Sequence, residues 1–491
     1  MELKPSKRSA IRSFKVMDVV AKADRLARSG RDIYHLEVGQ PQSSAPKPCI
    51  KVAQEQLAND RCGYTAARGE PPLRDAIAQM YTTTYGCTAQ ASRIHLTPGS
   101  SGAFTIAFMA AFDVGDVVAV PSSCYPCYRN LLQTYGCIVV SVPVNKDYNL
   151  TAVELAAAQS ARSARGEVPI KGLILSSPAN PTGAMLSPEE LKALCELCDS
   201  TCVQFISDEL YHGITYKGAP RAACALEFSS KPIVINGFSK SYSMTGWRLG
   251  WLIAPDHLDS CVDALNQNMN VSAPTVSQRA AVAALGPEAA VELEEHRVKY
   301  EANMKVVVEG LTRMGVQPHE YAPPQGAFYI YVNLKGHGVT DSLGMCNALL
   351  EEAGVAMTPG VDFEEEGSGL GEQRVRISFP GGTEQIREAM KRFIEWWEGE
   401  GGKKWRVQGN GANGNGGVFD PAVASASAVN AHFEAQLGAT DDAQFAAMRK
   451  RRLEELEELQ SLAEDVAASG MDAAAQQVGL EWATRIGAFI A

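Results

Sequence analysis

The sequence predicts an α/β fold with a large, mostly parallel, helix-covered sheet, a smaller α+β domain and a C-terminal helical tail. Three observations support this prediction. Short apolar runs alternate with helical segments between residues 96 and 254, which is typical of parallel strands joined by crossover helices. Residues 326–397 contain fewer strands mixed with helices. After residue 400 the composition shifts to glycine, asparagine and alanine.

The length of the chain indicates more than one domain. At 491 residues it is too long for a single compact core. Residues 400–417 are dense in glycine and asparagine, as flexible linkers are. The predicted order begins with an N-terminal arm that includes part of the small domain (1–45), followed by a large domain (46–285) and a small domain (286–399). A linker (400–425) and an alanine-rich helical tail of unknown role (426–491) follow.

The expected elements follow from periodicity and from the residues that end them. An amphipathic pattern over residues 14–30 predicts a helix that stops at Gly30, and Pro72 starts another. Further helices are expected at residues 46–59, 103–112, 151–162, 188–202, 341–353 and 384–397, and the segment 257–313 is helical and charged. Apolar runs predict strands at residues 34–38, 117–120, 138–144, 171–175, 203–207, 232–235, 249–254, 326–332 and 374–379.

The charge balance argues against two classes of partner. The net charge is -11, and a protein that binds nucleic acid or an anionic membrane needs a basic face. The most basic run, residues 449–452, is followed by glutamates and indicates a solvated helix. That helix, expected at residues 443–468, has a leucine stripe that could pack on the main body or pair with another chain.

No apolar stretch approaches the roughly 18 residues of a membrane span, and the basic N-terminus lacks an apolar secretory core. We therefore expect a cytoplasmic protein. Its 12 cysteines lack framework spacing and are expected to be reduced thiols. Cys195, Cys198 and Cys202 recur at helical spacing and predict one buried helix face, and Cys124 and Cys127 form a second lone pair. Neither group indicates a metal site.

Polar side chains follow the ends of several predicted strands. Asn180, Asp208, Tyr211 and Lys240 each come just after an apolar run. The carboxyl ends of parallel strands meet at one edge of a sheet, where open α/β folds bind ligands. We therefore expect these four side chains to lie close together.

Three further features have both a ligand-binding and a plain structural interpretation. Gly39 either brings a bare backbone amide to a ligand or forms a simple turn. The segment 99–102, Gly-Ser-Ser-Gly, opens into an apolar helix as an anion cradle or as an ordinary N-cap. Tyr125 could stack on a flat ring or pack in the core.

Lys240 lies between two apolar runs, and Arg248 follows eight residues later. A lysine held at a strand end can form a Schiff base when its surroundings favour the neutral amine. A guanidinium matches a phosphate with two parallel hydrogen bonds. Together they suggest pyridoxal 5'-phosphate bound to Lys240 with its phosphate on Arg248. A lone Ser-Lys would more simply be a surface loop, but the other strand-end residues favour the site.

Three motifs in this order and spacing strengthen that interpretation: Asn180-Pro-Thr-Gly183, Asp208-Glu-x-Tyr211 and Ser239-Lys240-x-Tyr-x-Met-Thr-Gly-Trp-Arg248-x-Gly250. With them, residues 12–398 resemble the pyridoxal-phosphate-dependent class I/II aminotransferases of the aspartate aminotransferase superfamily. The resemblance also includes Gly39-Gln-Pro41, the Gly99–Gly102 segment and Arg376. It implies the transferase fold of that family.

The resemblance implies a role for each matching residue. Lys240 would carry the cofactor and move the substrate's α-proton, Asp208 would pair with the pyridine nitrogen, and Asn180 and Tyr211 would donate to the phenolic oxygen. Arg376 would bind the substrate's α-carboxylate near Gly39. The remaining contacts implied for the cofactor are stacking by Tyr125 and phosphate binding by Ser100, Ser101, Gly102, Ser239, Arg248 and, from a neighbouring subunit, Tyr64.

The implied function is transfer of an amino group from an L-amino acid to a 2-oxo acid, usually 2-oxoglutarate, through a Lys240 aldimine in a ping-pong cycle. A homodimer with shared active sites is expected. A carbon–sulfur lyase or synthase on the same fold is the alternative, because fold does not fix reaction. Gly237 departs from the family, in which many members have a phosphate-binding Ser or Thr there. The sequence does not identify the amino donor.

Overall fold

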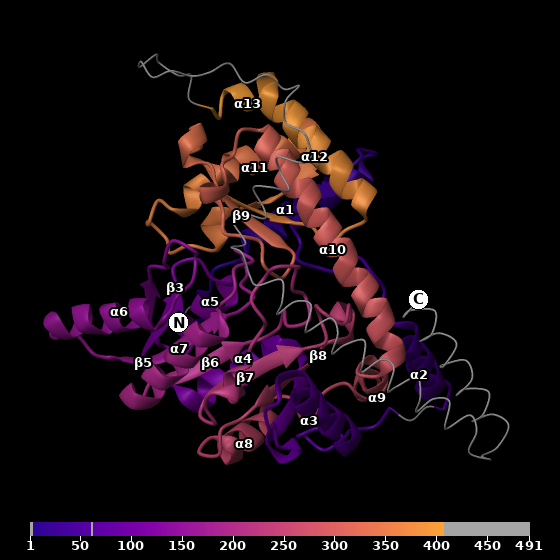
Figure 1. The fold of residues 1–491 in the computed structure, drawn as a ribbon, viewed down its shortest axis with the longest axis vertical. Helices are drawn as coiled ribbons and strands as arrows, with labels where there is room; N and C mark the ends of the chain where they lie inside the picture. The colour runs from indigo at the N-terminus through magenta and orange to yellow at the C-terminus, as the bar shows by residue number, and fades with distance from the viewer. Residues whose placement is uncertain (1–2, 60–61, 407–491) are drawn as a thin grey trace, which may run out of the picture. The chain divides into compact units, whose positions relative to one another are not determined.

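A seven-stranded sheet forms the centre of the computed structural model, which describes residues 3–59 and 62–406 (Figure 1). Its strands lie in the order β2 (Ile94–Pro98), β8 (Leu249–Ile253), β7 (Ile233–Gly237), β6 (Gln204–Asp208), β5 (Ile170–Ser176), β3 (Val117–Pro121) and β4 (Ile138–Val142). Only β8 is antiparallel to its neighbours within this sheet. The fold is therefore the predicted α/β type with a mostly parallel sheet.

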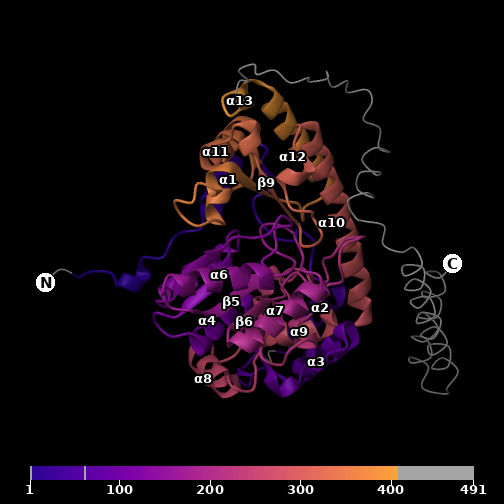
Figure 2. The ribbon, with the colours of Figure 1, turned by 60° about the vertical axis from the view of Figure 1, so that its left-hand side comes forward.

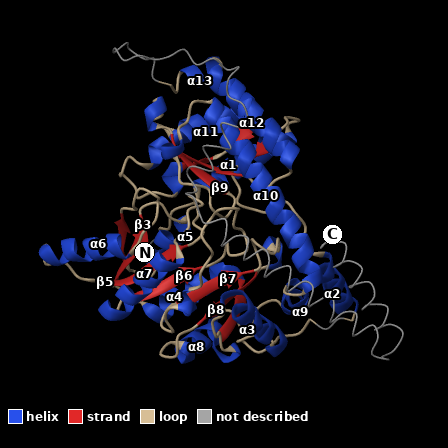
Figure 3. Cartoon of the chain, viewed as in Figure 1, coloured by secondary structure: helices blue, strands red, loops and turns tan. Residues whose placement is uncertain are grey.

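Helices cover both faces of this sheet, as Figure 3 shows. Along β3, Val118 and Val120 pack into one core cluster while Val117 and Ala119 pack into the other. Alternate residues of a strand point to opposite faces, so a strand apolar at every position is buried on both sides. The first cluster contains residues of α4 (Gly99–Ala111), α5 (Pro126–Thr134) and α8 (Asp259–Met269). The second contains residues of α2 (Lys47–Ala58), α3 (Pro71–Tyr85), α6 (Ala152–Ala164), α7 (Pro188–Thr201) and α9 (Thr275–Ala284).

Local sequence signals explain where several helices begin. Thr151 and Glu154 form a reciprocal capping box ahead of α6, and Ser187 and Glu190 do the same ahead of α7. Each pair satisfies backbone amides that have no partner within the helix. Glycines in the left-handed region end α3 and α11 (Ser342–Ala353), at Gly86 and Gly354 respectively.

A second, smaller group of strands lies beside the ends of the large sheet. An antiparallel sheet has the order β11 (Thr358–Pro359), β12 (Arg374–Ser378) and β9 (Tyr329–Asn333), and β1 (Tyr34–His35) pairs in parallel with β10 (Val355–Ala356). Helices α1 (Lys15–Arg28), α11 and α12 (Thr383–Glu398) pack around them (Figure 2). The long helix α10 (Pro287–Arg313) contacts α2 and α9 of one group and α12 of the other.

Some details differ from the sequence predictions. Residues 34–38 are expected as one strand, but the paired strand contains only Tyr34 and His35. Leu36 continues with single backbone bonds, its amide to Ala356 and its carbonyl oxygen from Ser378. Cys195 and Cys198 are buried as predicted, whereas the prediction for Cys202 was wrong: it caps α7 in the left-handed conformation and is exposed. The linker predicted from residue 400 begins with a helical turn, α13 (Glu400–Lys403).

The linker beyond residue 406 and the predicted tail, including the helix expected at residues 443–468, lie outside the described residues. Residues Met1–Gly411 belong to one compact unit. The division of that unit into an arm, a large domain and a small domain stays a prediction. None of the described helices combines the length and the apolar character that a bilayer crossing requires.

Candidate active site

Polar residues gather at the carboxyl ends of adjacent parallel strands. Asp208 is the last residue of β6, Lys240 follows β7, Asn180 follows β5 and Tyr125 follows β3. Arg376 enters from β12 of the smaller sheet, and its Nη1 donates to Asn180 Oδ1 at 2.9 Å. The candidate site therefore lies at the carboxyl edge of the large sheet, where the strand-end pattern placed Asn180, Asp208 and Lys240, and Arg376 is added from the smaller sheet.

Lys240 is held in surroundings that favour its neutral amine. Its Nζ donates to the carbonyl oxygen of Gly39 at 2.6 Å. Burial, followed by the positive charges of Arg376 and Arg248, lowers the pKa of Lys240 to about 8, although Asp208 opposes the shift. A lysine with a pKa near 8 has a substantial neutral fraction at physiological pH, which nucleophilic chemistry requires.

Gly39 is a glycine because another side chain fills the space beside it. A Cβ at this position would collide with the hydroxyl group of Tyr329. That hydroxyl lies 2.8 Å from the hydroxyl of Tyr211. Tyr329 therefore packs against Gly39 and forms a hydrogen bond with Tyr211. The sequence left open whether Gly39 offers its backbone amide to a ligand or forms a simple turn. In this structure its carbonyl oxygen accepts from Lys240, and the role of its amide stays a prediction.

Asp208 is 3 % exposed, and two donors hold its carboxylate. The amide of Leu210 donates to Oδ1 at 3.1 Å, and the hydroxyl of Tyr128 donates to Oδ2. Burial outweighs both hydrogen bonds and the nearby Lys240, and it raises the pKa of Asp208 to about 6. A bound cation would therefore be strongly favoured beside this carboxylate.

Arg376 is fixed on several sides but has no carboxylate partner among the described residues. Its Nη2 donates to the carbonyl oxygen of Glu37 at 2.5 Å and to Thr358 Oγ1 at 3.3 Å. The rings of Tyr329 and Phe363 lie 4.6 and 4.8 Å from its guanidinium carbon. A buried guanidinium oriented in this way and left without an anion is suited to a carboxylate ligand.

A second cationic feature lies at the start of α4. Residues Gly99–Gly102, which the sequence placed ahead of a helix, form its first turn, whose amides have no intrahelical acceptor. The guanidinium of Arg248 lies so close to Gly99 that a Cβ there would be 2.5 Å from its Nη2. Among the described residues, no carboxylate forms an ion pair with Arg248. A helix N-terminus beside an arginine favours a phosphate.

The remaining predicted phosphate contacts differ in exposure. Ser100 and Ser239 are buried, whereas Ser101 is exposed. Gly250 on β8 packs directly against the start of α4, and a side chain there would not fit, since its Cβ would lie 2.6 Å from the amide nitrogen of Ser100. An open cavity of about 650 Å³ adjoins this region and is lined mainly by residues 40–45 and 245–247.

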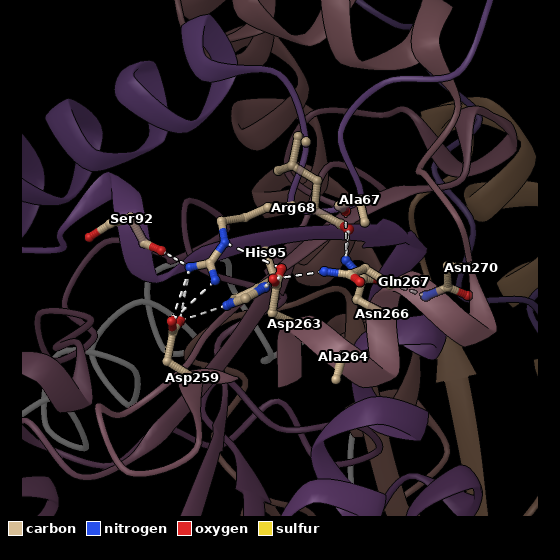
Figure 4. Close-up of polar contacts among 12 residues, drawn as sticks. Ala67, Arg68, Ser92, His95, Asp259, Asp263, Ala264, Asn266, Gln267 and Asn270 are labelled. Carbon is tan, nitrogen blue, oxygen red and sulfur yellow. Dashed lines mark hydrogen bonds and ion pairs between the residues drawn. The ribbon is translucent and has the colours of Figure 1, made fainter. Parts of the chain in front are cut away.

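Tyr64 makes little contact with its own chain, because it is 88 % exposed. The segment after it is firmly anchored (Figure 4). Arg68 forms an ion pair with Asp259 of α8 at 3.0 Å, and Asn266 of the same helix donates to the carbonyl oxygen of Ala67 at 2.7 Å. The Tyr64 segment is therefore held against α8 while Tyr64 itself faces outward.

Two residues in contact with the site were not assigned roles from the sequence. Tyr128, the donor to Asp208, lies three residues after Tyr125, so both project from the start of α5 on one side. Tyr329, whose hydroxyl lies 2.8 Å from that of Tyr211, is the second. Helical spacing could have indicated Tyr128, but the approach of Tyr329 to Gly39 depends on how the two groups of strands pack.

The charges of the site suit pyridoxal 5'-phosphate. Three cations, Lys240, Arg248 and Arg376, are grouped with one carboxylate, Asp208. An anionic phosphate would complement Arg248 and the α4 amides, and a protonated pyridine nitrogen would complement Asp208. Arg376 would remain for the carboxylate of a substrate.

Comparisons with known proteins agree with this chemistry. Residues 31–393 match the family Aminotransferase class I and II. The chain is 42% identical over 391 residues to valine–pyruvate aminotransferase of Mycobacterium tuberculosis, covering 79% of this chain and 97% of that protein. It is 33% identical over 387 residues to (5-formylfuran-3-yl)methyl phosphate transaminase of Methanocaldococcus jannaschii, covering 78% and 96%.

Solved structures are similar as well. A crystal structure of an aminotransferase from Mycobacterium tuberculosis has a TM-score of 0.75 at 42% identity, covering 80% of this chain and 99% of that one. Aspartate aminotransferase from Thermus thermophilus with maleate has a TM-score of 0.72 at 29% identity, covering 80% and 100%.

The fold and the family match define a pyridoxal-phosphate-dependent transaminase. The chain belongs to the class I and II aminotransferases, as its motifs indicated.

Proposed function

We propose that this enzyme moves an amino group from an L-amino acid to a 2-oxo acid in a ping-pong cycle in which Lys240 transfers the proton. The observation that carries the proposal is the position of Lys240, whose pKa is lowered to about 8 beside two arginines and Asp208. When bound, pyridoxal phosphate supplies an aldehyde for the amine and a ring that accepts electrons. The protein must then bind the carboxylate, hold the ring and move one proton.

The side chains around Lys240 support a division of these tasks. Arg376 binds the substrate's α-carboxylate, and its bond to Asn180 Oδ1 leaves the amide hydrogens of Asn180 to donate to the phenolic oxygen together with Tyr211. Asp208 keeps the pyridine nitrogen protonated. Tyr125 would stack on the ring, and Ser100, Ser101, Gly102, Ser239 and Arg248 would bind the phosphate.

The acceptor has two candidates. Family resemblance suggests 2-oxoglutarate, whereas the name of the relative that is 42% identical suggests pyruvate. A dicarboxylic acceptor needs a second cation, and the neighbouring arginine, Arg374, is already paired with Glu364 at 2.7 Å. That pairing favours an acceptor with one carboxylate, such as pyruvate, and a donor with a neutral side chain.

A panel of amino donors with each acceptor tests these proposals. Valine with pyruvate should yield alanine, and the same donor with 2-oxoglutarate should yield glutamate more slowly. Lys240→Ala should form neither product. Release of ammonia and pyruvate from cysteine without any added oxo acid would instead support the alternative, a carbon–sulfur lyase.

We also propose a homodimer in which Tyr64 reaches the phosphate of the neighbouring subunit, which its 88 % exposure allows. Lys240→Ala and Tyr64→Ala subunits can be mixed, unfolded and refolded together. If Tyr64 acts across the interface, mixed dimers contain one site with both changes and one intact site, so activity returns. If Tyr64 acts within its own chain, each site of a mixed dimer carries one change and no activity returns.

A further inference from the structure

His212 comes directly after Tyr211 but contacts a different part of the molecule. It is 5 % exposed, and its Nδ1 lies 2.8 Å from the hydroxyl of Tyr85 on α3. Its Nε2 lies 3.0 Å from the carbonyl oxygen of Ser177. The ring is thus held between a helix beneath the sheet and the segment that follows β5.

These partners specify the protonation state of the ring. The Ser177 carbonyl can only accept, so Nε2 carries the hydrogen, and Nδ1 then accepts from the Tyr85 hydroxyl. Oε2 of Glu209 lies 3.6 Å from Nδ1. Burial lowers the pKa of His212 to about 4 and raises that of Glu209 to about 8, so neither is mainly charged at neutral pH and the two do not form an ion pair.

Ser177 begins the short segment that ends in Asn180. Its amide donates to the carbonyl oxygen of Asp208 at 3.3 Å, and its hydroxyl accepts from the amide of Leu186 at 3.0 Å. The Nε2 bond from His212 satisfies its carbonyl as well. The position of Asn180 is therefore tied to the same turn, residues 208–212, that carries Asp208 and Tyr211.

We propose that His212 is a positioning residue that fixes Asn180 relative to Tyr211, so that both present their donors to one oxygen of the cofactor. The inference rests on the proposed roles of those two residues. His212 itself touches neither substrate nor cofactor. It acts by joining the Ser177 carbonyl to the turn after β6. Tyr85 helps to fix the orientation of the His212 ring, because any other orientation would break the hydrogen bond between the Tyr85 hydroxyl and Nδ1.

Two substitutions separate the hydrogen bond from the bulk of the ring. His212→Gln keeps a side-chain N–H that can reach the Ser177 carbonyl, whereas His212→Leu removes it. Tyr85→Phe leaves Nδ1 without its donor. The matched control is Tyr81→Phe on the same helix, which loses the bond from Trp251 Nε1 at 3.2 Å. The Tyr81 ring contacts that of Tyr85, but its hydroxyl forms no hydrogen bond with His212 or Ser177.

The readout is the pH midpoint of the absorbance change of the cofactor attached to Lys240. Donors to the phenolic oxygen stabilise its negative charge, so misplacing one makes the chromophore hold its proton to higher pH. We expect His212→Leu to raise the midpoint by roughly half a pH unit or more, Tyr85→Phe by less, and His212→Gln and Tyr81→Phe hardly at all. Cofactor affinity of the apoenzyme should weaken in the same order.

The inference is overturned if His212→Leu lowers thermal stability but leaves the midpoint and the cofactor affinity unchanged. If His212→Leu does not fold, Tyr85→Phe against Tyr81→Phe makes the same comparison. Failure of the proposed function would give a different result. The wild-type protein would then lack transamination, and the absorbance midpoints of the variants could still be compared with its own.

Discussion

Tyr128 donates its hydroxyl hydrogen to Oδ2 of Asp208, so the side-chain hydrogen-bond partner of the buried carboxylate of the site is uncharged and not a cation. This bond lowers the pKa of Asp208, but burial still raises the pKa from 3.8 to about 6. Near pH 6 the carboxylate therefore gains a proton and loses its attraction for a protonated pyridine nitrogen.

Tyr128→Phe should raise the pKa of Asp208 further, because it removes a hydrogen bond that stabilises the anion. We expect cofactor affinity to fall by roughly tenfold at neutral pH, corresponding to about 1.4 kcal/mol. Wild-type affinity should decline as pH falls through about 6, and the decline in the variant should begin at higher pH. Titration of the apoenzyme with pyridoxal phosphate at several pH values measures both effects. Tyr135→Phe, on the residue that caps the same helix, is the control; identical pH profiles for both variants would contradict the prediction.

The charge on Lys240 should make the apoenzyme less stable than it would be without that residue. Folding lowers the pKa of Lys240 from 10.5 to about 8, which means that the folded protein destabilises the protonated form of this side chain. The cost is present in full below pH 8 and disappears as pH rises through about 8 to 10.5. The shift corresponds to roughly 3 kcal/mol, and loss of the charged hydrogen bond to Gly39 offsets about half of it.

Lys240→Met should therefore stabilise the apoenzyme by roughly 1 to 2 kcal/mol at neutral pH while abolishing transamination. The gain should shrink as pH approaches 10. Urea unfolding of the apoenzyme at several pH values measures it. Lys51→Met, at an exposed lysine on α2, should change little at any pH. A gain at Lys240 that does not vary with pH would indicate a packing effect instead of a charge effect.

Strand order explains why part of the site could be predicted from sequence. Asn180, Asp208 and Lys240 each follow an apolar run, and parallel strands joined by helices bring such ends to one edge. Arg376 could be placed on one strand face because it alternates with Val375. These inferences needed only local patterns and the resemblance.

Contacts between elements distant in sequence could not be predicted in the same way. Tyr329 approaches Gly39 across 290 residues of chain, and no local periodicity marks the pair. The segment with Phe363 and Glu364 contacts β12 and the loop after β3 only in the folded protein. Packing between two groups of strands fixed these contacts, and the sequence carried no separate signal for them.

Gly237, at the position where many relatives have a phosphate-binding hydroxyl, is crowded by the neighbouring strand. A Cβ there would lie 3.2 Å from Gly250 Cα and 3.2 Å from the carbonyl oxygen of Leu249. Gly237→Ala should therefore destabilise the protein by about 1 kcal/mol. Gly237→Ser should cost the same stability but bind the cofactor more tightly than Gly237→Ala, by roughly tenfold if its hydroxyl reaches the phosphate.

Unfolding measurements on the two Gly237 variants give the steric cost in stability, and cofactor titrations give the gain in affinity from the hydroxyl. The comparison of serine with alanine cancels the steric cost, because both add the same Cβ. Equal cofactor affinities would show that the hydroxyl does not reach the phosphate. No loss of stability in either variant would show that β8 moves aside freely.

Glu364 and Arg374 form an ion pair within the smaller group of elements, and both also bond to Ser123 in the loop after β3. Glu364 Oε1 accepts from Arg374 Nη1 at 2.7 Å, from Ser123 Oγ at 2.6 Å and from Tyr331 OH at 3.0 Å. The glutamate side chain is 1% exposed and that of the arginine 15%. Removing one partner would leave a buried charge without compensation, which costs roughly 3 kcal/mol or more.

A double-mutant cycle with Glu364→Gln and Arg374→Met should therefore give a coupling energy of roughly 2 kcal/mol, with the double variant less destabilised than the sum of the single ones. Urea unfolding of the apoenzyme measures each corner. The control is the exposed pair Arg165 and Glu167, whose side chains are 57% and 37% exposed and whose coupling energy should be much smaller, because solvent screens the two charges. Additive effects at Glu364 and Arg374 would mean that neither side chain depends on the other, and the pairing with Glu364 would then give no reason to exclude a dicarboxylic substrate from Arg374.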